Sequence, residues 1–113
     1  MGRTLKLPNG DQATVDSRKL REYCLNPDHP RGRNKARVFA SVGIQQADAE
    51  ELRTALLAAA SRAEAQPGAE TQYGQRYIVD FDLVQGKRTV KIRSGWIVRI
   101  GEDSPRLTTC YVI

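Results

Sequence analysis

Hydrophobic and polar positions change their spacing near residue 70. From about residue 18 to that point, apolar residues recur three and four positions apart, which is the spacing of one face of an α-helix. After it they alternate with polar residues, which is the spacing of a strand with one buried face. This order predicts an α+β fold, in which helices pack on one face of a C-terminal antiparallel sheet.

The N-terminal segment predicts a β-hairpin. Residues 4–7 and 12–15 each alternate polar with apolar side chains, and the Asn9-Gly10 step between them is a strong hairpin-turn signal. We therefore expect a short pair of strands ahead of the helices, in addition to the sheet formed by the second half of the chain.

Three helices are predicted between the hairpin and the sheet, because each has a capping signal and apolar residues at helical spacing. They are residues 18–24, capped by Asp16 or Ser17; residues 34–42, capped by Asn34 and ended by Gly43; and a long helix that starts at Asp48 and ends before Gln66-Pro67-Gly68-Ala69. The last segment is predicted to break the helix and to lead into the sheet.

Three strands are predicted after that break, because period-two alternation continues to the last residue. They are residues 73–84, residues 88–100 beyond a turn at Gln85-Gly86-Lys87, and residues 106–113 beyond a turn at Gly101–Pro105. Gly95 interrupts the second of them and predicts a bulge or a bend.

The composition indicates one folded domain spanning residues 1–113, since 40% of the residues are hydrophobic and 27% are charged, close to globular averages. A chain of 113 residues leaves no room for separate catalytic and cofactor domains. It contains no apolar run of signal-peptide or membrane-spanning length. We therefore expect a cytoplasmic protein that does not enter membranes.

No metal or other cofactor is expected. With two cysteines, and with His29 as the only histidine, the chain cannot assemble a zinc ligand set. Asp80 and Asp82 would suit Mg²⁺, but a lone Asp-x-Asp pair is weak support for a site. Cys24 and Cys110 are interpreted as two reduced, partly buried thiols.

The net positive charge is concentrated in one segment. Residues 18–37 contain seven of the 18 Lys and Arg residues but two of the 13 Asp and Glu residues. This segment alone therefore accounts for the formal net charge of +5, and the charges of the remaining chain cancel. Such a distribution is typical of a patch that binds phosphates, the alternative being a solvated basic surface.

Lys35 is the cation of this basic segment that is predicted to lie at the end of an apolar helix face. The stripe formed by Val38, Phe39 and Val42 extends back to Lys35, and the first turn of a helix presents unpaired N–H groups to an anion. Gly32 would let the backbone approach that anion closely. The flanking cations predicted to bind phosphate with Lys35 are Arg31, Arg33 and Arg37. The alternative is that Lys35 only extends its ammonium into water.

His29 is the natural proton carrier of the chain, because imidazole alone among side chains ordinarily titrates near neutral pH. Asp28 beside it could orient the ring. The alternative is a turn residue between two prolines. Polar strand positions that could line a cleft, or simply cover a solvated sheet face, are Arg93, Arg99, Thr108, Thr109 and Tyr111.

The segment 25–39 reads Leu-Asn-Pro-Asp-His-Pro-Arg-Gly-Arg-Asn-Lys-Ala-Arg-Val-Phe. It resembles a family of small bacterial domains of unknown function with a Leu-Asn-Pro-x-His-Pro-x-Gly-x-x-Lys-Ala-x-x-Phe motif. Further matches to that family are Tyr73-Gly74-Gln75-Arg76-Tyr77, Trp96-Ile97 and Arg106-Leu107-Thr108-Thr109-Cys110-Tyr111. The resemblance thus covers nearly the whole chain.

The order of elements and the final Thr-x-Tyr strand also resemble the barnase/EndoU/RelE-like superfamily of small ribonucleases and toxin domains. That resemblance implies metal-independent attack of a ribose 2′-hydroxyl on the neighbouring phosphate. It implies His29 as the proton-transfer residue and Lys35 with Arg31 as charge stabilisers. Thr109 and Tyr111 would be the contributions of the last strand. A second base is not evident in the sequence.

Together these features predict a toxin-like RNA-binding protein that can cut RNA without a metal ion. The alternative is a non-enzymatic module that binds nucleic acid or protein within a small two-gene, toxin–antitoxin-like system. The expected partners are RNA and an acidic antitoxin or immunity protein, which a basic segment would attract.

Overall fold

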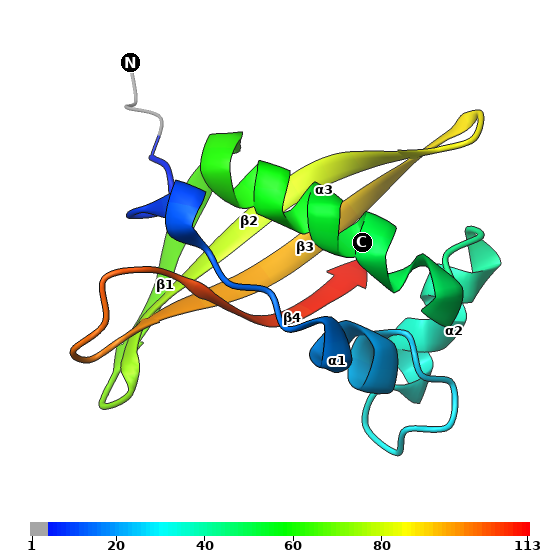
Figure 1. Cartoon of the computed structure of the whole chain (residues 1–113), viewed down its shortest axis with the longest axis horizontal. Helices are drawn as coiled ribbons and strands as arrows, with labels where there is room; N and C mark the ends of the chain where they lie inside the picture. Colours follow the sequence, from blue (N-terminus) through cyan, green and yellow to red (C-terminus); the bar gives the residue numbers. More distant parts are fainter. Residues whose placement is uncertain (1–4) are drawn as a thin grey trace.

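The alternating part of the chain builds a four-stranded antiparallel sheet. In the computed structural model, which describes residues 5–113, the strands pair in the order β1-β2-β3-β4, so that neighbours in sequence are neighbours in the sheet (Figure 1). The strands are β1 (Ala65–Thr71), β2 (Gly74–Gln85), β3 (Arg88–Arg99) and β4 (Arg106–Val112). With the helices that precede it, this sheet confirms the predicted α+β class.

The helices lie close to the predicted segments. They are α1 (Ser17–Lys19), which continues into a π-helical turn η2 (Leu20–Cys24); α2 (Arg33–Ser41); and α3 (Ala49–Arg62), preceded by a 3-10 turn η3 (Gln46–Asp48). The Asp16 carboxylate accepts the Arg18 N–H at 2.9 Å, which confirms the predicted Asp16 cap. None of the helices within residues 5–113 is long and apolar enough to cross a membrane.

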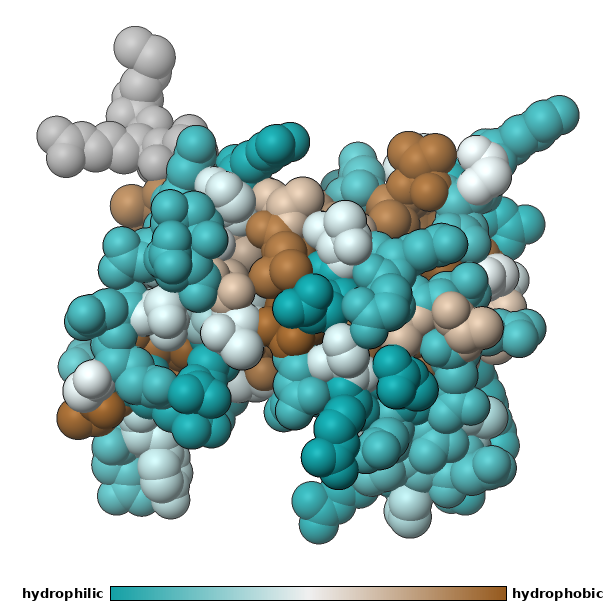
Figure 2. Space-filling view, in the orientation of Figure 1, coloured by the Kyte–Doolittle hydropathy of each residue, from teal (hydrophilic) through white to brown (hydrophobic). Residues whose placement is uncertain are grey.

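The core lies between α3 and one face of the sheet. Val79, Ile92 and Trp96 are fully buried on that face, and Leu52 and Leu56 of α3 belong to the same cluster. Figure 2 shows the helix side of the molecule, where hydrophilic residues dominate and apolar ones form separate patches. The opposite face of the sheet carries the alternate, mostly polar side chains, because successive strand residues point to opposite sides.

A buried hydrogen-bond chain joins β2 and β3 in this core. Ser94 Oγ donates to the Val79 carbonyl at 2.7 Å and accepts the Trp96 Nε1–H at 2.9 Å. Ser94→Ala is expected to lower the free energy of unfolding by about 2 kcal/mol, because the buried indole N–H then has no acceptor. Urea unfolding measures this loss.

The matched test of that explanation is a double-mutant cycle with Trp96→Phe. Phenylalanine has no N–H to satisfy, so Trp96→Phe should cost less stability in the Ser94→Ala background than in the wild type. Equal costs in both backgrounds would mean that the Ser94 hydroxyl does not act through the indole.

The prediction of an N-terminal hairpin is wrong for residues 5–15. Residue 4, the first of the predicted hairpin, lies outside the described residues. The segment forms one 3-10 turn, η1 (Gly10–Gln12), and the residues on either side of the turn bond to the sheet instead of pairing with each other as strands. Ala65 N–H donates to the Leu5 carbonyl at 2.7 Å, and Thr14 forms a bridge to Arg106, the first residue of β4. A Cβ on Gly10 would collide with the Ala60 carbonyl oxygen, so the turn closes against α3.

The segment predicted only as a helix breaker is in fact strand β1. Pro67 and Gly68 lie within it, and its pairing with β2 shifts register between Pro67 and Glu70. An edge strand tolerates a proline, because one side of its backbone has no neighbour to bond. The sheet therefore has one strand more than the sequence pattern predicts.

The second helix begins before its predicted Asn34 cap. Its N-cap is Gly32, because helix-type hydrogen bonds begin in the preceding loop. Arg33 N–H donates to the His29 carbonyl at 2.9 Å, and Ala36 N–H donates to the Gly32 carbonyl at 3.0 Å. Asn34 is therefore an exposed residue of the first turn. The predicted end is confirmed by Gly43, which has a φ of 88°.

Candidate functional site

Lys35, in the first turn of α2, is half-buried where this helix meets β4, and two hydroxyl groups hold its ammonium. Its Nζ donates to Thr109 Oγ1 at 3.1 Å and to the Tyr23 hydroxyl at 3.4 Å. It also lies 5.1 Å from the ring centre of Tyr23 and 5.7 Å from that of Tyr111. No carboxylate in the part of the chain that the structure describes forms an ion pair with it. The ammonium is thus fixed in place with its charge available to an anion.

The packing of α2 separates Lys35 from the arginines predicted to act with it. Ala36 and Phe39 are buried and carry Lys35 inward with them. Arg33 and Arg37 are two positions away from Lys35 on either side, which is about 200° around a helix, and both are exposed. The structure therefore does not bring these cations together. Val38, predicted within the apolar stripe, is 45% exposed, because the buried side of α2 is the one that carries Ala36 and Phe39.

The His29 ring is fixed by the loop in which it lies. Its Nδ1 accepts the backbone N–H groups of Arg31 at 3.0 Å and Gly32 at 3.1 Å, and the ring meets Tyr23 edge-on at 4.8 Å between centres. Because Nδ1 is an acceptor here, the neutral ring carries its proton on Nε2 and acts there as a donor. Backbone groups and Tyr23, and not Asp28 as predicted, orient the imidazole.

Gly32 has a different role from the one predicted. It is buried, and a Cβ at this position would collide with the carbonyl oxygen and carbon of Tyr23. The glycine therefore allows the loop before α2 to pack against η2, which brings Tyr23 within reach of both His29 and Lys35. The Gly32 N–H already donates to His29 Nδ1 at 3.1 Å.

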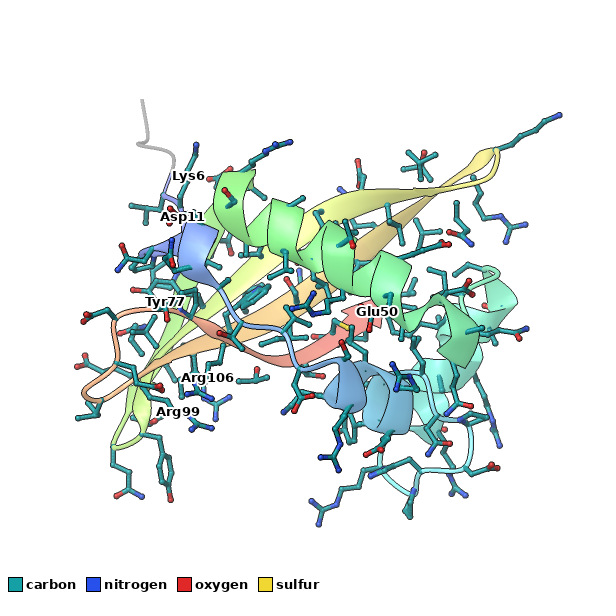
Figure 3. All side chains as sticks on the ribbon, in the orientation of Figure 1. Lys6, Asp11, Glu50, Tyr77, Arg99 and Arg106 are labelled. Carbon is teal, nitrogen blue, oxygen red and sulfur yellow. The ribbon has the colours of Figure 1, made fainter. Side chains whose placement is uncertain are left out.

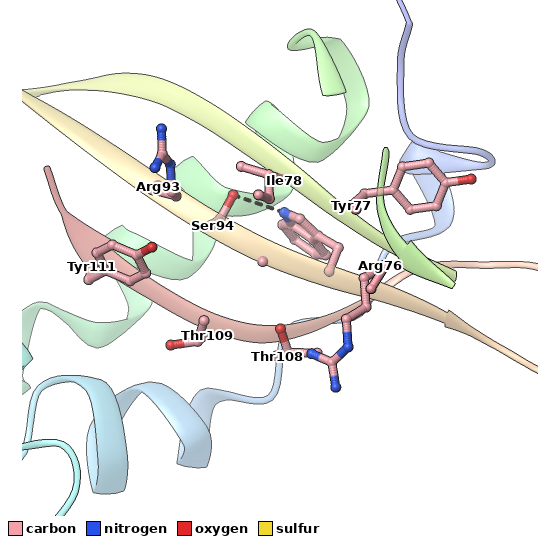
Figure 4. Close-up of a pocket in the computed structure, with 12 residues that line it drawn as sticks. Arg76, Tyr77, Ile78, Arg93, Ser94, Thr108, Thr109 and Tyr111 are labelled. Atoms are coloured by element: carbon pink, nitrogen blue, oxygen red, sulfur yellow. Dashed lines mark hydrogen bonds between the residues drawn. The ribbon is translucent and has the colours of Figure 1, made fainter. Parts of the chain in front are cut away.

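The open face of the sheet is hollowed beside Lys35. Gly95 has no side chain there, and the predicted irregularity is confirmed as a bulge, since Gly95 pairs with Thr109 while Trp96 pairs with Leu107. The hollow has a volume of about 230 Å³. Side chains at its wall, shown in Figure 4, include Arg76, Ile78, Arg93, Thr108, Thr109 and Tyr111. Four of the five strand residues predicted to line a cleft thus do so.

The fifth, Arg99, lies elsewhere. It is near the end of the molecule away from α2, together with Arg106 (Figure 3). Glu102 pairs with both, at 3.9 Å from Arg99 Nε and 2.7 Å from Arg106 Nη2, and these guanidinium groups hold the Glu102 pKa below its usual range, the Arg106 hydrogen bond being the larger cause. Arg99 is therefore part of a surface ion-pair cluster.

A second hollow of about 550 Å³ lies between the first helical segment and β4. Lys19, Tyr23, His29 and Thr108 contribute to its wall, and Lys19 Nζ donates to the Thr108 carbonyl at 3.3 Å. Thr108 lines both hollows, while the two hydroxyl partners of Lys35 line one hollow each. Lys35 therefore stands between the two hollows.

The carboxylates considered for Mg²⁺ are both engaged with cations on the open face. Arg93 forms a two-pronged hydrogen bond to Asp80, at 2.9 Å for each contact, and holds the Asp80 pKa below its usual range. Lys91 pairs with Asp82 at 3.5 Å. Within residues 5–113, no group of three or more side chains has the arrangement of a metal site. These two aspartates thus belong to cross-strand ion pairs.

The two cysteines lie under the site, and both are free and fully buried instead of partly buried as predicted. Cys24 follows Tyr23 in sequence, and Cys110 stands between Thr109 and Tyr111 with its side chain toward the core. A hydrogen bond from the Cys110 thiol lowers the pKa of Cys24 to about 7 against the effect of burial. The same hydrogen bond and burial raise the pKa of Cys110. This pair connects the two elements that hold Lys35.

Some contributors to the site escape prediction from the sequence. Tyr23 fits the apolar spacing of its helix, so nothing in the pattern distinguishes it from a core residue. Arg76 is one of many polar strand positions. Gly95 is predicted as a bulge, but the hollow that it opens depends on how Ile78 and Thr109 flank it across the sheet.

A family model matches residues 6–113, which is almost all of the described chain. The chain belongs to the family described as domain of unknown function DUF6883. The predicted membership in a domain family of unknown function is thereby confirmed. No curated protein and no solved structure matches the chain. Since the family description names no activity, function has to be inferred from the chemistry of the site.

Proposed function

We propose that this chain is a toxin-like protein that binds RNA and cleaves it without a metal ion. The observation that carries the proposal is the position of Lys35, whose ammonium is held by Thr109 and Tyr23 between two hollows and has no carboxylate partner within residues 5–113. An RNA strand presents the matching pattern, because a negatively charged phosphate lies between every two nucleosides.

The proposed reaction is transfer of the phosphate to the neighbouring ribose hydroxyl. The 2′-oxygen bonds to phosphorus as the bond from phosphorus to the 5′-oxygen breaks, which leaves a 2′,3′-cyclic phosphate and a 5′-hydroxyl. The 2′-hydroxyl loses its proton to water, and the 5′-oxygen takes one from water. Lys35 stabilises the negative charge that gathers on the five-coordinate phosphorus. In this proposal two neutral hydrogen-bond donors assist Lys35: the Nε2–H of His29, whose ring meets that of Tyr23, and the hydroxyl of Tyr111, whose ring centre lies 5.7 Å from Lys35 Nζ.

A DNA oligonucleotide with a single internal ribonucleotide tests this chemistry in excess EDTA. We expect one cut, directly after the ribonucleotide, with a 2′,3′-cyclic phosphate on the upstream fragment. The all-DNA oligonucleotide is the control and should stay intact, since it has no 2′-hydroxyl. Cleavage of the all-DNA strand, or cleavage that requires added Mg²⁺, would contradict the proposed mechanism.

The second candidate function is binding of RNA without cleavage. It is favoured by one observation: His29 Nδ1 is already occupied by two backbone N–H groups, so the ring offers no free base for the 2′-hydroxyl. This module would bind RNA with an affinity that falls with salt, and the removal of one phosphate-binding cation would reduce the logarithmic salt slope by about 0.7. An acidic partner protein would compete for the same cations.

A further inference from the structure

The cation Arg93 in the hollow on the open sheet face is paired with a carboxylate, whereas Lys35 beside the hollow is not, in the part of the chain that the structure describes. Arg93 lines the hollow, but its guanidinium is neutralised by the two-pronged pair with Asp80. Lys35, at the edge, has no such partner among the described residues. Arg76 also lines the hollow without an ion pair within residues 5–113, but its exposed guanidinium extends away from Arg93 and Tyr111 (Figure 4). A phosphate is therefore attracted to Lys35, whereas the part of the hollow beside Arg93 and Tyr111 is suited to a neutral group attached to that phosphate.

The size of the hollow limits what can enter it. A volume of about 230 Å³ lies below the range of about 300–1,000 Å³ that drug-sized ligands occupy. It fits a single ring system better than a whole nucleotide. Gly95 adds no side chain to the floor of this hollow, between its cross-strand partners Ile78 and Thr109, and a Cβ there would come within 2.9 Å of Thr108 Oγ1.

The wall of the hollow combines flat and apolar surfaces with hydrogen-bonding edges. Ile78, the Thr109 methyl group and the Tyr111 ring give apolar contact, and the Thr108 hydroxyl gives a hydrogen-bond donor and acceptor (Figure 4). The Arg93 guanidinium is held in one orientation by Asp80 and keeps unused N–H donors. Proteins recognise unpaired bases with this combination of stacking surfaces and polar edges.

We propose that this hollow is a nucleobase pocket, which holds the base of the nucleotide whose phosphate lies at Lys35. Thr109 links the two sites directly, because its hydroxyl accepts from Lys35 Nζ at 3.1 Å while its methyl group lies beside Gly95 at the wall of the hollow. Tyr111 also contributes to both sites, because its ring centre lies 5.7 Å from Lys35 Nζ and the residue lines the hollow. The inference rests on the proposed function and adds that cleavage depends on the base at the cut site.

Five oligonucleotides test the pocket, each carrying one ribonucleotide in a DNA strand: adenine, cytosine, guanine, uracil or no base. Wild-type protein is expected to cut the preferred base about 10- to 100-fold faster than the abasic site, the range that stacking of one base supports. Ile78→Trp fills the hollow from β2 and is expected to reduce cleavage of the preferred base to the abasic rate.

The matched control is Val84→Trp, which places the same ring on the same face of β2, outside the hollow and at a position 70% exposed. It should keep the wild-type preference. The proposed nucleobase pocket would be rejected if the wild type cut all five strands equally, or if its base preference persisted in Ile78→Trp. Either result would still support the proposed ribonuclease activity. Failure to cut any of the five strands would overturn both.

Discussion

Lys35→Met is expected to slow RNA cleavage by about 100- to 1,000-fold, the usual cost of removing one group that stabilises developing charge. Methionine keeps an unbranched apolar side chain in the space between η2 and β4, so the fold should persist. The cleavage rate is measured on the single-ribonucleotide strand in EDTA, and the fold is checked by the melting temperature.

The matched control for that variant is Arg37→Met. It lies on the same helix and removes the same positive charge, but its side chain points into solvent on the other side of α2. Its cleavage rate should stay close to that of the wild type. If both variants lose activity to the same extent, the overall charge, and not the fixed position of Lys35, supports the reaction, and the site assignment fails.

Gly32→Ala is expected to lower the free energy of unfolding by about 3 kcal/mol, near the upper end of the usual cost of overpacking. The added methyl group would collide with the backbone of Tyr23, which cannot move aside as a flexible side chain can. The same displacement would separate Tyr23 from Lys35 and loosen the Gly32 N–H bond to His29. Urea unfolding and the cleavage rate should therefore both report a loss.

Gly68→Ala is the control for the Gly32 variant. Its added Cβ would approach Arg76 no closer than 3.6 Å, an ordinary contact, and the position is exposed. We expect a stability change within about 1 kcal/mol. A Gly32→Ala protein as stable as Gly68→Ala would show that close packing of the loop on η2 does not hold the site together.

Most of the sheet could be predicted from the sequence because each of its last three strands has one buried face. That asymmetry appears directly as alternation, with Val79 and Ile92 on the inner side. The N-terminal hairpin and β1 could not be predicted in the same way. Strand β1 pairs with the adjacent β2, but it is exposed along most of its length and so shows no alternation. The N-terminal segment has backbone partners far away in sequence: Leu5 bonds to Ala65, and Thr14 bridges to Arg106. Local turn signals carry no information on such partners.

The candidate site was predictable where it depends on one helix and unpredictable where it depends on contacts between elements. Helical spacing places Lys35 at the boundary of core and solvent, as the structure has it. The same spacing also directs Arg33 and Arg37 outward, a consequence that a count of charges along the chain does not reveal. The acceptor role of His29 Nδ1 depends on loop geometry that no spacing rule describes.

The decisive experiment for the ribonuclease is incubation of the purified protein with total RNA in excess EDTA, beside Lys35→Met. We expect discrete cleavage products with the wild type and intact RNA with the variant. RNA that stays intact while bound to the wild-type protein would contradict the ribonuclease and leave a binding module that uses the same lysine.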